Sequence, residues 1–197
     1  MARRIAREGY CVLLPDLYYR LGTIHMKYDR NNEHIIKLMR AARGSLTDEM
    51  VYEDTASVLL HLDGQDTVKP GKVGAVGHCM SGSFIMTVAA RFPNRIAAAA
   101  AFYGTQIITD QPDSPHLIAP NIRGEILLSF AETDQYVADS VPARIKDILD
   151  AAGVKNTVEV VKGTHHAFCF PERSSYHPEE AENAWEKLRV LFARTLK

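Results

Sequence analysis

The sequence has few cysteines, no cluster of one charge sign and no long apolar run. Its three cysteines, Cys11, Cys79 and Cys169, form an odd and sparse set among 197 residues. Such a set argues against a disulfide framework and fits a reducing compartment. The 23 basic and 24 acidic residues leave a formal net charge of −1, without the clustered Lys and Arg of a nucleic-acid-binding protein. We therefore expect a cytoplasmic protein with no nucleic-acid partner.

Segments that would direct the chain to a membrane or hold a cofactor are also missing. The N-terminal residues "MARRIAREGY" lack the apolar centre of a signal peptide, and no window approaches the ~18 apolar residues of a membrane span. No phosphate-binding glycine loop or dinucleotide fingerprint occurs. The run "HHAFC" offers His165, His166 and Cys169 to a metal, but no second Cys or His pair gives zinc spacing. We expect no membrane partner, no metal and no organic cofactor.

What the chain does have is a regular alternation of helical and strand-like segments. Hydrophobic residues make up 46% of the chain, and the length suits one domain over 1–197. The short strands are apolar throughout, as in a parallel sheet covered by helices on both faces, so the sequence predicts an α/β fold. Patterns predict helices at 2–8, 33–42, 48–62, 80–91, 141–152 and 179–196, strands at 10–16, 72–76, 95–104, 125–130 and 157–161, and a long loop at 105–121.

Three residues with catalytic chemistry follow three of the predicted strands. Cys79, Asp134 and His166 come after the strands that begin at residues 72, 125 and 157. Because the carboxyl ends of parallel strands meet at one edge of a sheet, these side chains should converge there. Their order along the chain, nucleophile then acid then histidine, is that of hydrolases with a nucleophile elbow.

The residues around Cys79 suit such an elbow, in which a strand turns sharply into a helix. Small residues let the strand and helix approach, and Gly77, Ser81 and Gly82 provide them. The helix N-terminus favours a thiolate, and the backbone N–H of Met80 can face a developing oxyanion. His166 would accept the thiol proton, and Asp134 would orient the imidazole.

Each assignment has a competing interpretation. A cysteine is often a small buried apolar residue, and Cys11 and Trp185 are expected to be core residues of that kind. His78 either lines the pocket or faces the surface. The competitors are His165 for the base, Glu132 and Asp139 for the acid, and Ser81 and Ser83 for a serine nucleophile. Neither serine occupies the corner position of the elbow.

Five segments resemble the dienelactone hydrolases, the carboxymethylenebutenolidase family of the α/β-hydrolase fold. They are "EGYCVLLPDLYYR", "GKVGAVGHCMSGS", "AAAFYG", "ETDQYV" and "HHAFCFPER", and the resemblance runs from about Ala2 to the C-terminus. It implies hydrolysis of a small ester or lactone without a cofactor. By resemblance Cys79 is the nucleophile, Asp134 the acid and His166 the base, and we expect His78, Tyr103 and Phe168 to line the substrate pocket.

Two departures from the family pattern concern the site. Ser81-Gly82 stands where the family usually has Gly-Gly, a small change. Phe170 stands where the family has an arginine that holds the substrate carboxylate, and the sequence does not show that Arg173 or Arg20 replaces it. We therefore expect a small ester or lactone other than dienelactone.

A third departure is at the start of the chain. Family members carry a further N-terminal segment with the first strands, a second oxyanion donor and a glutamate that restrains the cysteine. We expect a sheet that lacks these strands and leaves inner edges unpaired beside 10–15 and 72–76. A miscalled start, a truncation, and closure of the gap by dimerisation or strand shifts all stay open. The alternative function is a catalytically impaired scaffold or oligomer subunit that binds a partner through the open edge.

Overall fold

The computed structural model describes residues 1–22 and 31–197. These residues form two compact units, Met1–Lys69 and Pro70–Lys197. The expectation of one domain over the whole chain stays a prediction. None of the helices in the described residues has the length and apolar character needed to span a membrane.

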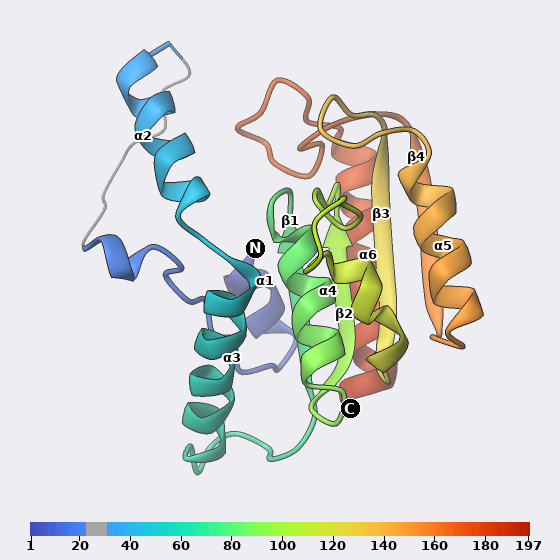
Figure 1. The fold of residues 1–197 in the computed structure, drawn as a ribbon. Helices are drawn as coiled ribbons and strands as arrows, with labels where there is room; N and C mark the ends of the chain where they lie inside the picture. The colour runs from blue at the N-terminus through green and yellow to red at the C-terminus, as the bar shows by residue number, and fades with distance from the viewer. Residues whose placement is uncertain (23–30) are drawn as a thin grey trace. The chain divides into compact units, whose positions relative to one another are not determined.

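The C-terminal unit is built on a parallel sheet in the order β1-β2-β3-β4 (Figure 1). Its strands are β1 (Val73–His78), β2 (Ile96–Phe102), β3 (Glu125–Thr133) and β4 (Asn156–His165). Every neighbouring pair is parallel, with Ala101 of β2 opposite both Gly77 of β1 and Leu128 of β3. The predicted parallel α/β sheet is confirmed for these strands, and β4 extends to His165 rather than ending at Val161.

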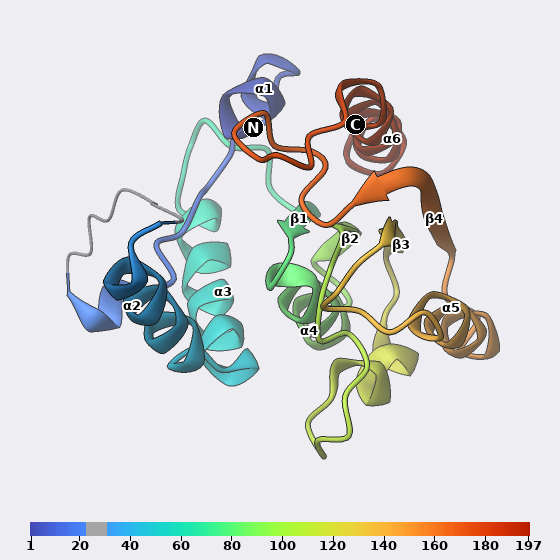
Figure 2. The same ribbon diagram turned by 90° about the horizontal axis from the view of Figure 1, so that it is seen from above.

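Helices cover both faces of this sheet. They are α4 (Ser81–Arg91), α5 (Val141–Ala151) and α6 (Pro178–Leu196). Figure 2 shows α6 on one face and α4 and α5 on the other. The alanines of β2 are small enough for helices to approach from either side, and four of them are almost completely buried. Burial between two helical layers explains why an alanine-rich segment forms a strand despite its helical propensity.

The main core lies between the sheet and the layer of α4 and α5. It includes Met86 of α4, Leu128 of β3 and Ile145 of α5, none of which is exposed. The predicted loop at 105–121 is wrong over its last 7 residues, where Pro115–Asn121 form the 3-10 helix η2 and contribute Ala119 to this core. The prolines led to the loop prediction, but Pro115 occupies the first turn, where proline is tolerated, and Pro120 lies inside this short helix.

The N-terminal unit is helical. It contains α1 (Ala2–Arg7), η1 (Tyr19–Leu21), α2 (Glu33–Gly44) and α3 (Asp48–Asp63). Local signals explain its helix starts: the side chains of Asn32 and Thr47 accept hydrogen bonds from the first backbone N–H groups of α2 and α3. Arg20 forms a two-pronged ion pair with Asp54 of α3, with both N–O distances 2.8 Å.

The strand predicted at residues 10–16 does not form. The segment is irregular, and its Cys11 is exposed rather than in a core. Residues 13–15 instead line an apolar hollow of about 300 Å³ with part of α3. An apolar run becomes a strand only where another strand pairs with its backbone, and no described strand does so here. Trp185, the other expected core residue, is only half-buried.

Candidate active site

Cys79 lies at the turn between β1 and α4. Its φ is +56°, a left-handed conformation that is uncommon outside glycine. The strand and helix come close at this turn: a Cβ added to Gly77 would lie 2.6 Å from the Cβ of Ser81. The predicted sharp corner with small flanking residues is therefore present, and Ser81 fits within it. The corner residue is the cysteine, and not Ser81 or Ser83.

The backbone of Cys79 is fixed to the end of β2. Its N–H donates to the carbonyl of Phe102 at 3.2 Å, and its carbonyl accepts from the N–H of Thr105 at 2.8 Å. A Cβ on Gly82 would lie 2.5 Å from the Cα of Gly104, so the start of α4 packs directly against this turn. These contacts hold the corner residue rigidly beside residues 102–105.

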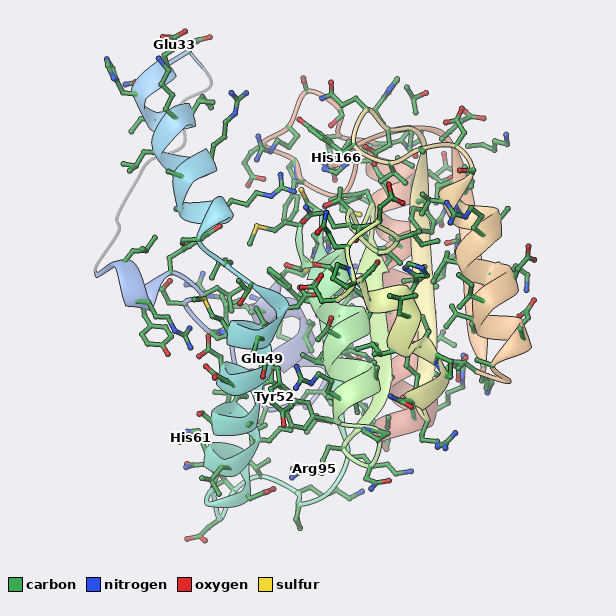
Figure 3. All side chains as sticks on the ribbon, in the orientation of Figure 1. Glu33, Glu49, Tyr52, His61, Arg95 and His166 are labelled. Atoms are coloured by element: carbon green, nitrogen blue, oxygen red, sulfur yellow. The ribbon has the colours of Figure 1, made fainter. Side chains whose placement is uncertain are left out.

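His166 and Asp134 meet at the same end of the sheet. The Nδ1 of His166 lies 2.7 Å from the Oδ2 of Asp134, and only 3% of the Asp134 side chain is exposed. The other carboxylate oxygen accepts the N–H of Tyr136 at 3.0 Å. Figure 3 shows His166 at the end toward which the strands run, and Arg95 at the opposite end. With Nδ1–H donating to the carboxylate, Nε2 is left to face a reacting group.

The electrostatics of His166 link it to Cys79. Burial lowers the pKa of His166, but the hydrogen bond to Asp134 and the neighbouring Cys79 outweigh burial and raise this pKa to about 9. The buried Nε2 makes no hydrogen bond of ordinary geometry to a described residue. The interaction with the thiol is therefore loosely aligned, as catalytic contacts often are before substrate binds. An imidazolium close to a thiol favours the thiolate.

Aromatic rings surround this histidine. The rings of Tyr136 and Tyr103 lie 4.7 and 5.1 Å from the His166 ring, measured between centroids. Tyr136 is 57% exposed, whereas Tyr103 is completely buried. Sequence reasoning did not single out Tyr136, although it follows Asp134 by two positions in "ETDQYV", where a turn would bring its N–H to the carboxylate.

The remaining predicted residues lie around the corner. Met80 is the N-cap of α4, at the position expected for an oxyanion donor. His78 packs against Phe170, with ring centroids 5.2 Å apart, and burial lowers the pKa of His78 to about 4, so its imidazole is neutral near pH 7. Phe168 is completely buried with its ring against Tyr103. Phe168 therefore supports Tyr103 from within the core.

The competing residues point elsewhere. Glu132 binds Lys162 at 2.7 Å and the N–H of Gly163, and His165 and Asp139 are exposed. Within residues 1–22 and 31–197, no three His, Cys, Asp or Glu side chains gather as a metal site would require. The structure thus brings Cys79, Asp134 and His166 together and leaves their competitors outside.

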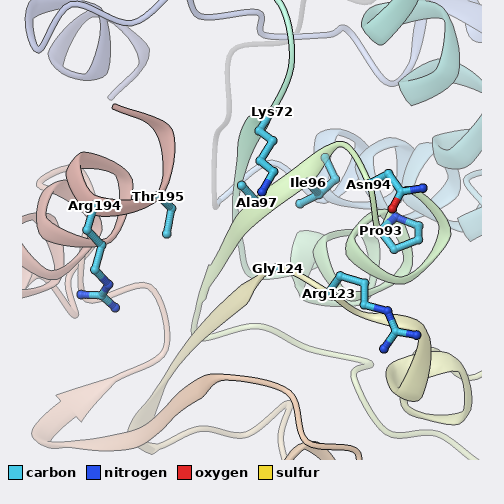
Figure 4. Close-up of a pocket in the computed structure, with 9 residues that line it drawn as sticks. All are labelled: Lys72, Pro93, Asn94, Ile96, Ala97, Arg123, Gly124, Arg194 and Thr195. Atoms are coloured by element: carbon cyan, nitrogen blue, oxygen red, sulfur yellow. The ribbon is translucent and has the colours of Figure 1, made fainter.

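A cavity lies at the other end of the sheet, where the strands begin (Figure 4). Its volume is about 570 Å³, and its lining includes the cations Lys72, Arg123 and Arg194. Arg194 is paired with the buried Glu125, which also binds Lys155 at 3.1 Å. Arg194 lies in the last turn of α6, where a cation complements the helix dipole. These contacts account for part of the charge here, and the cavity is distinct from the rim that holds Cys79.

Comparisons with known proteins identify the family of this chain. The sequence profile described as "Dienelactone hydrolase family" matches residues 1–196. An Aquifex aeolicus protein named "Putative carboxymethylenebutenolidase" is 32% identical over 193 residues, covering 98% of this chain and 78% of the relative. One with the same name from Synechocystis is 26% identical over 201 residues, covering 100% of this chain and 80% of the relative.

Solved structures give the same result. The crystal structure described as a "Putative Dienelactone Hydrolase" from Klebsiella pneumoniae has a TM-score of 0.81 and 26% identity, and the match covers 98% of this chain and 78% of that one. A dienelactone hydrolase-like promiscuous phosphotriesterase from metagenomic libraries, 20% identical with a TM-score of 0.77 and the same coverage, supports the fold alone. The chain therefore belongs to the dienelactone hydrolase family of carboxylic ester hydrolases with the α/β-hydrolase fold.

Proposed function

We propose that this hydrolase uses Cys79 as its nucleophile and cleaves a small ester or lactone through a thioester. The observation that carries the proposal is the joint placement of two features. A cysteine occupies a strained corner before a helix, and a His166–Asp134 pair lies at the same rim, where its imidazole interacts with the thiol. A cysteine buried only for packing would need neither the left-handed backbone nor the oriented imidazole.

Acylation begins with the proton of Cys79. The proton moves to Nε2 of His166, the sulfur forms a bond to the carbonyl carbon, and the carbonyl electron pair becomes an oxyanion near the N–H of Met80. As the oxyanion collapses, the bond to the leaving oxygen breaks and the imidazolium protonates that oxygen. The product is a thioester on Cys79 and an alcohol, which stays tethered when the substrate is a lactone.

Deacylation reverses the roles of the same groups. His166 removes a proton from water as the water oxygen attacks the thioester carbon, and the C–S bond then breaks. The carboxylic acid leaves, and the sulfur regains its proton from the imidazolium or stays a thiolate. Asp134 holds Nδ1–H throughout, so Nε2 is the atom that exchanges protons in both halves.

The residue at the family's arginine position argues against dienelactone as the substrate. The relatives are named carboxymethylenebutenolidase. If this chain acted on a substrate with such a carboxylate, the site would need a cation to bind it. Phe170 occupies the family's arginine position and packs against the neutral His78. We therefore propose a small ester or lactone other than dienelactone. His78 lies at this rim beside Phe170, whereas Tyr103 and Phe168 are completely buried and support the site from within. Formation of a homo-oligomer and a cytoplasmic location stay predictions, and the scaffold alternative is not favoured.

The test is replacement of the nucleophile. Cys79→Ala should abolish hydrolysis of p-nitrophenyl acetate by the purified full chain. The matched control is Cys11→Ala, which removes an exposed thiol from the N-terminal unit and should leave the rate unchanged. Mass spectrometry after a short treatment with iodoacetamide should find Cys79 labelled well before Cys11. Hydrolysis by Cys79→Ala at the parental rate would refute the assignment.

A further inference from the structure

The hydroxyl of Tyr103 is a buried polar group without a conventional partner. Tyr103 has no exposed surface, and its Oη makes no hydrogen bond of ordinary geometry to any described residue. A buried hydroxyl that lacks a partner destabilises a fold, and such groups in native proteins call for an explanation. Tyr103 also has a φ of +41°, so its backbone is strained as well.

The backbone places this tyrosine beside the nucleophile. Cys79 is hydrogen-bonded through its N–H to Phe102 and through its carbonyl to Thr105, the residues that flank Tyr103 and Gly104. The Tyr103 N–H donates to the carbonyl of Ser129 at 2.6 Å, which ties the same turn to β3. The strained turn is therefore anchored on both sides, and it holds Tyr103 next to the corner of the elbow.

The Tyr103 ring packs among the other groups of the site. It meets His166 edge-on at 5.1 Å and His78 at 5.6 Å, and Phe168 supports it from within the core. Cys169 makes a poorly aligned hydrogen bond with its hydroxyl, and Cys79 and Arg173 also act on it electrostatically. Among the described residues, the ionisable groups that face Tyr103 include two histidines, two thiols and one arginine.

The two neighbouring sulfurs differ in their ability to accept a hydrogen bond. Burial raises the pKa of Cys169 to about 12, so this sulfur stays a thiol, which is a weak acceptor. Burial also raises the pKa of Tyr103 far above its ordinary value, so the phenol keeps its proton as a donor. Cys79 lies close to the His166 imidazole and at a helix N-terminus, and both favour its ionised form.

From this arrangement, and resting on the proposed function, we infer that the Tyr103 hydroxyl donates a hydrogen bond to the sulfur of Cys79 when that sulfur is ionised. Tyr103 then sets how much of the nucleophile is present as thiolate. A hydrogen bond to a charged acceptor is roughly twice as strong as one to a neutral acceptor. Because the bond favours the ionised form, it shifts the thiol–thiolate equilibrium. It also explains why the hydroxyl is left without a good partner in the resting site.

The test deletes only this hydroxyl. Tyr103→Phe should move the midpoint of the pH dependence of Cys79 alkylation by iodoacetamide upward by about 1–2 pH units, the effect of one charge-assisted hydrogen bond. It should also lower kcat/KM for p-nitrophenyl acetate at neutral pH by roughly 10- to 100-fold. The matched control is Tyr176→Phe, which should change neither quantity. Tyr176 is a half-buried tyrosine in the loop between β4 and α6.

Stability separates this role from a structural one. At a pH low enough for the Cys79 thiol to be protonated, removing the unsatisfied buried hydroxyl should leave the thermal midpoint of Tyr103→Phe unchanged or slightly higher. A loss of stability should appear only as the pH rises and the parental thiol ionises, because the hydrogen bond to the thiolate is then missing. An equally lowered midpoint at both pH values, or loss of the cooperative transition, would mean that the hydroxyl serves the fold, and would overturn the inference. Suppose the parent protein shows fast labelling of Cys79 that depends on His166. If Tyr103→Phe then has the same alkylation midpoint as the parent, the inference is overturned while the proposed function stands. Labelling of Cys79 in the parent no faster than of Cys11 would refute the proposed function and the inference with it.

Discussion

The two units of the chain differ in what stabilises them. In the N-terminal unit the buried apolar residues among those described are Ile5, Ala42, Val51 and Leu59, and the prominent contacts are helix caps and the exposed Arg20–Asp54 pair. In the C-terminal unit every strand of the sheet carries buried residues, and the candidate site stands on the ends of three strands. Caps and surface pairs contribute about 1 kcal/mol each or less, whereas buried apolar side chains contribute several times more.

The packed C-terminal unit therefore has the rigidity that catalysis requires. A catalytic side chain must be held within a fraction of an ångström of its working position, which packed strands and helices achieve better than isolated helices. Cys79, Asp134 and His166 each follow a strand that is paired on at least one side. Substitutions in the two units should therefore differ in the size of their effects on activity and stability.

The largest expected effect is on catalysis at the strand ends. His166→Ala should lower kcat/KM for p-nitrophenyl acetate by roughly 10²–10⁴-fold, because it removes the proton acceptor of both half-reactions. The matched control is His165→Ala, which removes the adjacent exposed imidazole and should stay near the parental rate. Steady-state kinetics of the two variants decide the point. A loss in His165→Ala with normal activity in His166→Ala would exchange the two roles.

The same substitution in the two units should have different effects on stability. Leu128 of β3 has no exposed surface, and Leu128→Ala should lower the free energy of unfolding by about 2–5 kcal/mol through lost burial and a residual cavity. Leu14 is 83% exposed, and Leu14→Ala should change it by less than about 0.5 kcal/mol. Urea unfolding followed by far-UV circular dichroism measures both. Equal losses would show that the contrast between the units is wrong.

The contrast also explains which features could be predicted from the sequence. Helices in both units follow local periodicity and capping residues such as Asn32 and Thr47, which the sequence displays. The strands at 72–76 and 10–16 look alike as apolar runs, but only the first has a partner strand, and pairing is a property of the fold. The length and apolar character of a run therefore cannot show whether it will pair with another strand.

The candidate site was predictable where it depends on strand ends and turns. Cys79, Asp134 and His166 were found because each follows a predicted strand, and the topology of parallel sheets then brings them together. Tyr136 and the unbonded hydroxyl of Tyr103 were not, because ring contacts and unsatisfied atoms depend on side-chain packing between distant segments. The sequence therefore indicates the groups that react more readily than those that hold them.

Buried His78 should make the C-terminal unit sensitive to acid. Its folded-state pKa of about 4 lies below the ordinary value of 6.5, so between these values the unfolded chain binds a proton that the folded chain does not. Stability should therefore rise with pH from 4 to 6.5, and fall as acid is added, by up to about 3 kcal/mol from this group. Unfolding measured at pH 4.5 and 7 for the parent and His78→Phe checks this. An equal acid effect in both proteins would assign it to other groups.

A helix start in the N-terminal unit should be less sensitive to substitution than the core or the site of the C-terminal unit. The Thr47 hydroxyl accepts the N–H of Met50 at 3.2 Å, so Thr47→Ala should lower the helicity or stability of α3 by about 1 kcal/mol. Thr47→Ser keeps the acceptor and should preserve stability, which separates capping from loss of a methyl group. Amide hydrogen exchange in residues 48–63 reports on this helix directly. If packing rather than local bonding stabilised α3, both variants would exchange like the parent, and the difference drawn between the two units would no longer hold.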